Sequence, residues 1–298
     1  MFNIILYIIM FINQNNKFLP LVSDKFRKTD ENLVILFTNA RDEPNIAEWI
    51  AHHLLLGFDK IIVFDHLSKV PISNKLNSNF DRRVTVIRKT NNQSNVKEIF
   101  GKEAITMSQN MRASWLLYLD ADEYLLLNNI TNIKQFLHIF KEADAIGINW
   151  LMFGSSNHKT QPKGLLTENF IMSDKRLNKH VKTFVRPDRI SSSNSYNPHT
   201  YNIINPNRYY AATGNRMRPN PFNNVPIIFT KTVAYIAHYY VQSEEEYNRR
   251  KCRPMDNGTG PRQKDIDFNI HNEVINNQLQ NKYSQNTKAF LKKYGIEL

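Results

Sequence analysis

The sequence has little cysteine and little glycine: a single cysteine, Cys252, and 9 glycines in 298 residues. One cysteine excludes a disulfide framework and any zinc site built on several cysteines. With 12 prolines and 9 glycines, the composition is neither collagenous nor that of a linker. The sequence also lacks a P-loop, which argues against a P-loop nucleotide or phosphoryl enzyme. The length suits one domain of ordinary enzyme size, or two small ones, with a full core.

Acidic residues are in deficit, since 27 Asp and Glu face 39 Lys and Arg, for a formal net charge of +12. Such a surplus favours an anionic partner, which includes nucleic acid, a membrane surface and phosphorylated small molecules. A solvated, lysine-rich surface explains the charge equally well. We find no basic motif with interleaved aromatic residues, so we expect no specific nucleic-acid partner.

Residues 1–12 are almost wholly apolar, but a membrane-spanning helix needs about 20 such residues. The segment also lacks the basic start and the small-residue cleavage site of a signal peptide. We expect residues 1–30 to be an apolar segment and a linker that are dispensable for folding, followed by one domain over 31–298. An intracellular location is expected, and membrane association through residues 1–12 stays the alternative.

The first half of the chain alternates short apolar runs with helical patterns. Strands are predicted at Leu33–Thr38, Lys60–Asp65, Val84–Arg88, Trp115–Asp120 and Ala145–Phe153, with helices after Glu43-Pro44, over Val96–Ser114 and over Asn132–Lys141 with Thr131 as its cap. This order predicts an α/β fold with a mixed, mainly parallel sheet flanked by helices.

The second half is less regular. Strands are predicted at His180–Val185 and Val233–Tyr239, a helix at Ser243–Arg250 capped by Ser243, and a mostly helical tail over Asn272–Tyr294. Residues 191–225 show little periodicity, and a long irregular segment inside a compact domain is often a binding loop.

The strongest local signal is Asp120-Ala121-Asp122-Glu123, directly after an apolar strand. Two carboxylates at this spacing converge as the chain turns, and carboxylate oxygens suit hard cations such as Mn²⁺ or Mg²⁺. Open α/β sheets bind ligands at the carboxyl edge of their strands, where this pair is expected. Asp65 ends an earlier strand at the same edge and could accept hydrogen bonds from a ribose or a base. A solvated acidic turn and a structural Asp are the alternatives.

Several motifs, in order along residues 33–280, resemble those of family-2-like and family-92-like glycosyltransferases. They are Arg41–Glu43, Glu48–His53, Leu56–Asp65, Leu119–Tyr124, Trp150–Ser156, Lys182–Pro187, His238–Tyr240 with Ser243 and Lys251, and Asn272–Val274. The resemblance implies a GT-A fold, a nucleotide-sugar donor, a glycan or glycoprotein acceptor, and a divalent metal, Mn²⁺ or Mg²⁺, at Asp120 and Asp122. It also implies that Asp65, Arg41 and Glu43 lie near the nucleotide.

A histidine late in the chain often completes the metal or phosphate site of GT-A enzymes. His238, which follows an apolar run, is the first candidate, His199 is the second, and His180 is a further histidine considered for this role. Trp150 is a candidate for stacking on an acceptor sugar. For each of these residues, a structural role is the alternative.

Inverting transfer needs a base near the acceptor hydroxyl. Glu168 and Asp174 follow the Trp150–Ser156 block, and we predict that one of them is this base, with Glu168 preferred because Leu165, Leu166 and Phe170 flank it. The function predicted is therefore a metal-dependent glycosyltransferase. The alternative is a GT-A-like protein that binds without catalysis, since the Asp65–Val70 block lacks a later Asp of the family pattern.

Overall fold

A computed structural model describes residues 33–297 apart from 92–94, 193–195, 225–226 and 252–265. The strands are β1 Val34–Ala40, β2 Lys60–His66, β3 Val84–Lys89, β4 Trp115–Tyr118, β5 Glu123–Leu127, β6 Ala145–Met152, β7 Met172–Ser173, β8 Val181–Val185, β9 Tyr209–Ala211, β10 Ala234–His238 and β11 Val274–Ile275. The helices are α2 Ile46–Leu55, α3 Ile72–Lys75, α4 Val96–Asn110, α5 Ile133–Ile139, α6 Leu166–Asn169, α7 Glu244–Lys251 and α8 Gln278–Lys293. Short 3₁₀ turns lie at Pro187–Arg189, Pro206–Arg208 and Phe229–Lys231.

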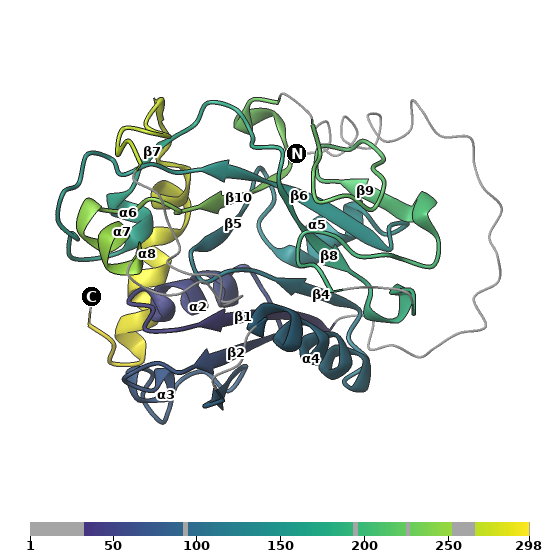
Figure 1. Cartoon of the computed structure of the whole chain (residues 1–298), viewed down its shortest axis with the longest axis horizontal. Coiled ribbons are helices and arrows are strands. Elements are labelled where there is room, and N and C mark those ends of the chain that lie inside the picture. Colours follow the sequence, from purple (N-terminus) through teal and green to yellow (C-terminus); the bar gives the residue numbers. More distant parts are fainter. Residues whose placement is uncertain (1–32, 92–94, 193–195, 225–226, 252–265, 298) are drawn as a thin grey trace.

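The strands form one large curled sheet in the order β3-β2-β1-β4-β8-β6-β10-β5, and β9 pairs with β6 (Figure 1). The pairs β1–β2, β2–β3, β1–β4, β6–β10 and β6–β9 are parallel, whereas β8 and β5 run antiparallel to their neighbours. A second, two-stranded sheet joins β7 to β11. The predicted α/β class with a mixed, mainly parallel sheet is confirmed.

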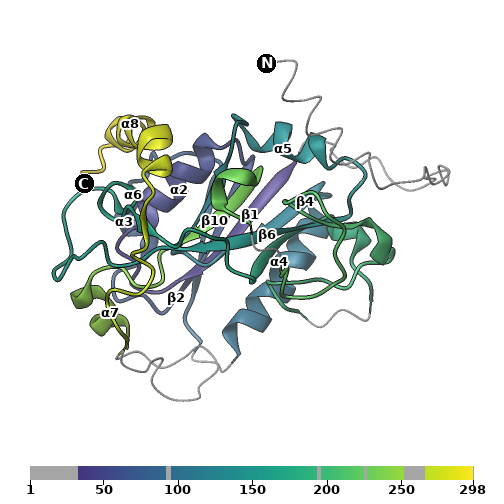
Figure 2. The same cartoon turned by 90° about the horizontal axis from the view of Figure 1, so that it is seen from above.

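Helices cover both faces of the sheet, with α2, α5 and α8 on one side and α4 on the other (Figure 2). Strand alternation divides the core accordingly, since successive side chains of β1 point to opposite faces. Leu36 belongs to the cluster under α2, while Ile35 and Phe37 join Phe100 of α4 in the second cluster.

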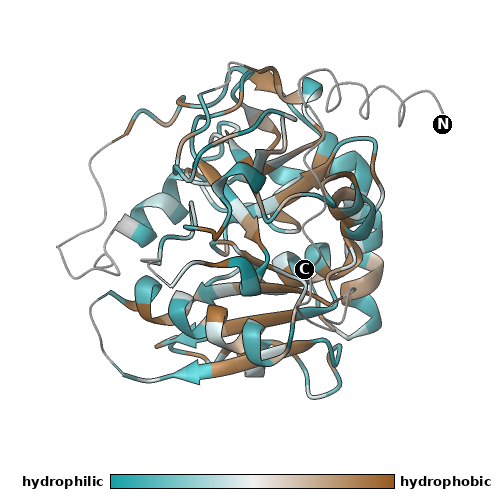
Figure 3. Cartoon of the chain, turned by 90° about the vertical axis from the view of Figure 1, so that its right-hand side faces the viewer, coloured by the Kyte–Doolittle hydropathy of each residue, from teal (hydrophilic) through white to brown (hydrophobic). Residues whose placement is uncertain are grey.

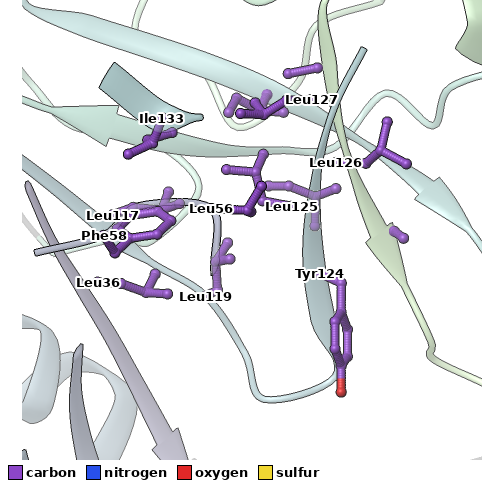
Figure 4. Close-up of a cluster of buried hydrophobic side chains, with 14 of the residues drawn as sticks. Leu36, Leu56, Phe58, Leu117, Leu119, Tyr124, Leu125, Leu126, Leu127 and Ile133 are labelled. Atoms are coloured by element: carbon purple, nitrogen blue, oxygen red, sulfur yellow. The ribbon is translucent and has the colours of Figure 1, made fainter. Parts of the chain in front are cut away.

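The larger cluster shows why these strands form a sheet buried on both faces. Leucines and aromatic rings from β1, β4, β5 and the segment after α2 pack together, and the Tyr124 hydroxyl is the polar atom among the labelled side chains (Figure 4). Apolar residues accordingly gather on the central strands, and polar residues on the outer helices and loops (Figure 3). None of the described helices is both long and apolar enough to cross a membrane.

Strand β5 lies at the end of the sheet order, and side chains of α2 occupy its outer edge. Trp49 Nε1 donates to the Glu123 carbonyl at 2.7 Å, and His52 Nε2 lies 2.8 Å from the Leu125 carbonyl. His53 Nε2 accepts from Leu125 N at 3.3 Å. The Trp-x-x-His-His spacing of α2 thus supplies the hydrogen bonds that a further strand would otherwise make. His53 is a core residue, because its ring is fully buried.

We expect the protein to lose stability as the pH falls from 6.5 towards 4. Burial lowers the pKa of His52 from 6.5 to about 4, so in this window the unfolded chain binds more protons than the folded one. When this histidine is fully protonated in the unfolded chain and still neutral in the folded one, the free energy of unfolding is lower by about 3 kcal/mol. Urea unfolding at several pH values should show a smaller pH dependence in His52→Gln. The exposed His138→Gln should keep the wild-type dependence, and equal slopes in all three proteins would contradict the argument.

The predicted strands of the first half are confirmed, with ends shifted by a few residues. The helix predicted at 96–114 ends at Asn110, and Asn132, rather than Thr131, caps α5 by accepting from Gln135 N at 3.0 Å. The tail is mostly helical as predicted, since α8 covers Gln278–Lys293, with the short strand β11 before it. Ser243 caps α7 as predicted, since its Oγ accepts from Glu246 N at 3.1 Å. The prediction for residues 1–30 lies outside the described residues.

Candidate functional site

Asp120 lies at the carboxyl edge of the sheet, in the turn between β4 and β5, and two lysines hold it. Lys97 Nζ, from the first turn of α4, lies 2.8 Å from Oδ1, and Lys182 Nζ, from β8, lies 3.1 Å from Oδ2. Burial alone would raise the pKa of Asp120, but the Lys182 and Lys97 ammonium groups outweigh it and hold this pKa well below the usual range. The carboxylate is therefore ionised at neutral pH.

Lys182 has a side chain with 0% exposure, which is unusual for an ammonium group. It also lies 3.4 Å from Glu123 Oε2, which accepts from Asp120 N at 2.9 Å. Burial lowers the pKa of Lys182, yet Asp120 and Glu123 raise it above its ordinary value overall. Burial raises the pKa of Glu123 to about 8, with Lys182 opposing this change. The two ammonium groups of Lys97 and Lys182 thus share one ionised carboxylate, that of Asp120.

Asp122 faces a second set of partners. Its Oδ2 lies 3.3 Å from Arg250 Nη1, and its Oδ1 lies 3.7 Å from His238 Nε2 at the end of β10. Arg250 is anchored by donation from Nη2 to the carbonyls of Tyr240 and Val241, at 2.8 and 3.0 Å. Burial lowers the pKa of His238 to about 4, with Asp122 opposing, so its imidazole is neutral at pH 7.

The segment after β1 borders this second set. Glu43 is buried, and burial raises its pKa to about 7, with Arg250 opposing and Asp122 adding to the rise. Arg41 is exposed in the same segment. Asp42 N donates to Ser68 Oγ at 3.0 Å, which ties the segment to the loop after β2. Contact of Arg41 and Glu43 with a nucleotide stays a prediction.

Asp65 has a fully buried carboxylate that holds neighbouring structure. Its Oδ2 lies 2.7 Å from Arg88 Nη1 and accepts from Ile72 N, at the start of α3, at 2.9 Å. The expected hydrogen bond from Asp65 to a nucleotide stays a prediction, and these contacts give the residue a structural role.

Trp150 lies at the centre of three histidine rings. The ring of His180 stacks on it at 5.1 Å, and those of His199 and His238 approach to 5.2 and 4.4 Å. His199 Nδ1 bonds the Val181 carbonyl at 2.7 Å, and burial lowers the pKa of this imidazole to about 3. The structure thus brings both predicted metal-binding histidines and Trp150 into one cluster, where stacking on an acceptor stays a prediction.

Buried polar atoms of this region lack hydrogen-bond partners within the described part of the chain. They include Glu123 Oε1, Trp150 Nε1, His238 Nδ1 and Arg250 Nε. Buried polar groups are nearly always hydrogen-bonded in folded proteins, and the exceptions concentrate at functional sites. Their proximity to Lys182 and Asp122 marks the place where a polar ligand would be accommodated.

The two candidate bases lie in different surroundings. Glu168 of α6 forms an ion pair with Lys288 of α8 at 2.6 Å. Helix α8 packs on the face of Tyr235, whose hydroxyl lies 2.9 Å from Gln278 Oε1, and strand alternation places His238 on the opposite face. Asp174 instead lies beside β6, and its carboxylate contacts His271 Nδ1. Neither prediction is tested, but the position of α8 argues against Glu168.

The turn after β6 holds the segment 268–272. Ser155 Oγ donates to the Phe268 carbonyl at 2.6 Å, and Asn272 Oδ1 accepts from Ser156 N at 3.1 Å. Gly154 permits this approach, because a Cβ there would lie 2.2 Å from Asn272 Oδ1 and 2.6 Å from the Ile270 carbonyl. The motifs Trp150–Ser156 and Asn272–Val274 are therefore two halves of one contact.

We expect Gly154→Ala to destabilise the protein by about 1–3 kcal/mol, because the added methyl group must displace backbone of the segment 268–272. Gly147→Ala is the matched control. Its Cβ would approach only the flexible end of Met217 closely, at 2.6 Å, so the cost should be smaller. Urea unfolding of both variants checks the difference, and an equal or larger loss in Gly147→Ala would contradict it.

No group of three or more His, Cys, Asp or Glu among the described residues is arranged to hold a metal ion, so a divalent cation here stays a prediction. Asp122 Oδ1 and the neutral His238 ring nitrogen Nε2 lie 3.7 Å apart. Two atoms bound to one ion at about 2.1 Å can lie up to roughly 4.2 Å apart, so this pair fits. Both oxygens of Asp120 already contact lysines, and His199 Nδ1 bonds a carbonyl, so neither residue is as free to serve as a ligand.

The carboxyl edge of this mixed α/β sheet thus gathers carboxylates, lysines, an arginine and histidines in one charged cluster. The family model of glycosyltransferase family 92 matches residues 35–291. The chain therefore belongs to this family and is a glycosyltransferase. A search of curated proteins found no match.

Solved structures that match part of the chain include HddC from Yersinia pseudotuberculosis, at 12% identity over 52% of this chain and 76% of that chain, with a TM-score of 0.33. The same protein complexed with GMP-PN matches at 10% identity over 72% of this chain and 96% of that chain, with a TM-score of 0.35. The 4-diphosphocytidyl-2C-methyl-D-erythritolsynthase from Anaerococcus prevotii matches at 9% identity over 54% of this chain and 72% of that chain, with a TM-score of 0.31. All three TM-scores are below 0.5, so these likenesses carry no argument about function.

Sequence reasoning assigned no role to Lys97, Lys182, Arg250 or His271. A signal existed for Lys182, since a lysine within the apolar strand Val181–Val185 is expected to be buried and paired. No local signal marked the other three, whose partners lie 23 residues away for Lys97, 128 for Arg250 and 97 for His271.

Proposed function

We propose that this glycosyltransferase uses a nucleoside-diphosphate sugar as donor, a divalent cation, and a glycan or glycoprotein hydroxyl as acceptor, with inversion at the anomeric carbon. One observation carries the proposal: cationic groups surround the adjacent carboxylates Asp120 and Asp122 at the carboxyl edge of the sheet. Such a site suits a diphosphate, whose oxygens accept charge-assisted hydrogen bonds from ammonium and guanidinium groups.

In this proposal Asp122 and His238 hold Mn²⁺ or Mg²⁺, which neutralises charge on the leaving diphosphate when bound. Arg250 stays on Asp122 and orients its carboxylate. Lys182 and Lys97 fix Asp120 and add positive potential where the diphosphate charge develops. The unpartnered atoms Trp150 Nε1 and Glu123 Oε1 are available for hydroxyl groups of the donor sugar.

Calorimetric titration of the full chain with UDP and with GDP, each with and without Mn²⁺, tests the proposal. We expect one nucleotide to bind in the presence of the metal and to lose affinity at least tenfold with a chelator. A screen of nucleotide sugars for release of that nucleotide then identifies the donor. Absence of binding by either nucleotide would contradict the proposal, and binding without turnover of any donor would favour the non-catalytic alternative.

A further inference from the structure

The strand register places Asp174 on the same face of the sheet as His238. Met152 of β6 is the register partner of His238 in the parallel pair with β10. On its other side, Phe153 pairs with Ser173, and Asp174 N donates to the Met152 carbonyl at 3.0 Å, so Asp174 lies opposite Met152. Register partners point to the same face, and neighbouring strands are about 4.8 Å apart. Asp174 therefore lies about 10 Å from His238, on its face.

His271 forms a dyad with Asp174. Its Nδ1 lies 2.9 Å from Oδ1 and 3.0 Å from Oδ2 of the carboxylate. A neutral imidazole that donates its Nδ1 proton to a carboxylate leaves a lone pair on Nε2. Among the described residues no group bonds Nε2, and the side chain is 17% exposed. This is the arrangement of a histidine base oriented by an acid.

The surrounding chain fixes the dyad at some conformational cost. His271 has a left-handed backbone with φ of 64°, and so do Ser156 and Asn157, with φ of 48° and 63°, in the turn that holds it. Non-glycine residues in this region cost free energy and concentrate at functional sites. The close contact of Gly154 with Asn272 and the hydrogen bond of Ser155 to the segment 268–272 keep His271 in this conformation.

A surface hollow adjoins the Asp174 side of the dyad. Asp174 lines a surface pocket of about 490 Å³, together with Lys175, Arg176, Leu177, Asn178, Lys179 and Glu273. This volume falls in the range of small-molecule sites, and its lining is mostly polar, as suits a carbohydrate.

We propose that His271 is the general base of glycosyl transfer and that Asp174 is the residue that positions it; this inference rests on the proposed function. Nε2 takes the proton of the acceptor hydroxyl while the acceptor oxygen forms its bond to the anomeric carbon. The bond from that carbon to the diphosphate oxygen breaks, and its electron pair leaves with the nucleoside diphosphate. The carboxylate of Asp174 then stabilises the imidazolium, which returns its proton to solvent.

The test compares wild type with His271→Asn, with Asp174→Asn, and with His138→Asn, which replaces an exposed histidine of α5. The probes are UDP and GDP for binding with Mn²⁺, and a panel of UDP-hexoses and GDP-hexoses with glycans released from a glycoprotein for transfer. We expect His271→Asn to bind the nucleotide within twofold of wild type but to transfer at least ~100-fold more slowly. We expect the loss of rate at acidic pH to disappear in this variant, and free imidazole to restore transfer to His271→Ala. Asp174→Asn should show a smaller loss, and Asp174→Glu should recover part of it.

Transfer by His271→Asn within tenfold of wild type, or no response of His271→Ala to imidazole, would overturn the assignment while nucleotide binding stands. Failure of wild type to bind either nucleotide would overturn the proposed function, and this inference with it. Thermal unfolding of each variant verifies folding, and His271→Gln replaces His271→Asn if the latter does not fold.

Discussion

Replacing Lys182 with methionine is expected to lower the free energy of unfolding by about 3–5 kcal/mol and to abolish nucleotide binding. The methionine side chain has a similar volume, so the effect comes from the lost charge. Lys182 is fully buried between Asp120 and Glu123, at 3.1 and 3.4 Å, and removing it leaves the ionised Asp120 without its buried partner. A carboxylate stranded in this way is costly because the protein interior solvates it poorly.

Lys97→Met is the matched control, since Lys97 contacts the other oxygen of the same carboxylate but is 35% exposed. A pair that shares solvent contributes only about 0–1 kcal/mol, so this variant should remain nearly as stable as wild type. Urea unfolding and nucleotide titration of both variants measure the difference. Similar losses of stability in the two would show that burial of Lys182 is not the source of its importance.

Asp122→Ala is expected to abolish metal-dependent nucleotide binding while the fold survives. Within the described part of the chain, the Asp122 carboxylate pairs with Arg250 and His238 alone. Without Asp122, Arg250 keeps its bonds to the Tyr240 and Val241 carbonyls. Stability should therefore change by no more than about 1–2 kcal/mol. Titration with UDP or GDP and Mn²⁺, alongside a thermal melt, checks both parts.

The exposed Glu98→Ala on α4 is the control for Asp122→Ala, because it removes a carboxylate whose partner is Lys102 of the same helix. It should bind nucleotide and metal as wild type does. If Asp122→Ala kept its affinity for nucleotide and Mn²⁺, the metal would have to be assigned to other residues.

Much of the fold could be predicted from the sequence, because its signals are local. The apolar runs of β1, β2 and β4 are strong, and the helical spacing of Ile46, Trp49 and His53 identified the buried face of α2. Strand β5 was missed, since Leu125–Leu127 follows a polar turn and becomes a strand only by pairing with β10, more than a hundred residues later.

The candidate site was predictable only in part. The position of Asp120 and Asp122 follows from the strand that precedes them, and that of His238 follows from the run before it. Their partners do not follow, because the hydrogen bond between Asp174 and His271 joins residues 97 positions apart. The two motifs that create this contact, Trp150–Ser156 and Asn272–Val274, are recognisable in the sequence, but only the folded chain shows that they contact each other.

The hydrogen bonds between ring nitrogens of α2 and the backbone of β5 affect how this protein could associate with other molecules. An edge strand with free backbone groups is a template for a strand of another chain, and proteins suppress such pairing in several ways. Here Trp49, His52 and His53 take up the outward groups of Glu123 and Leu125, so a foreign strand finds no hydrogen bonds to make at these positions. Protonation of His53 in acid would turn its Nε2 into a donor and break the bond from Leu125 N, which would expose this edge, so aggregation should accompany acid unfolding and proceed through β5.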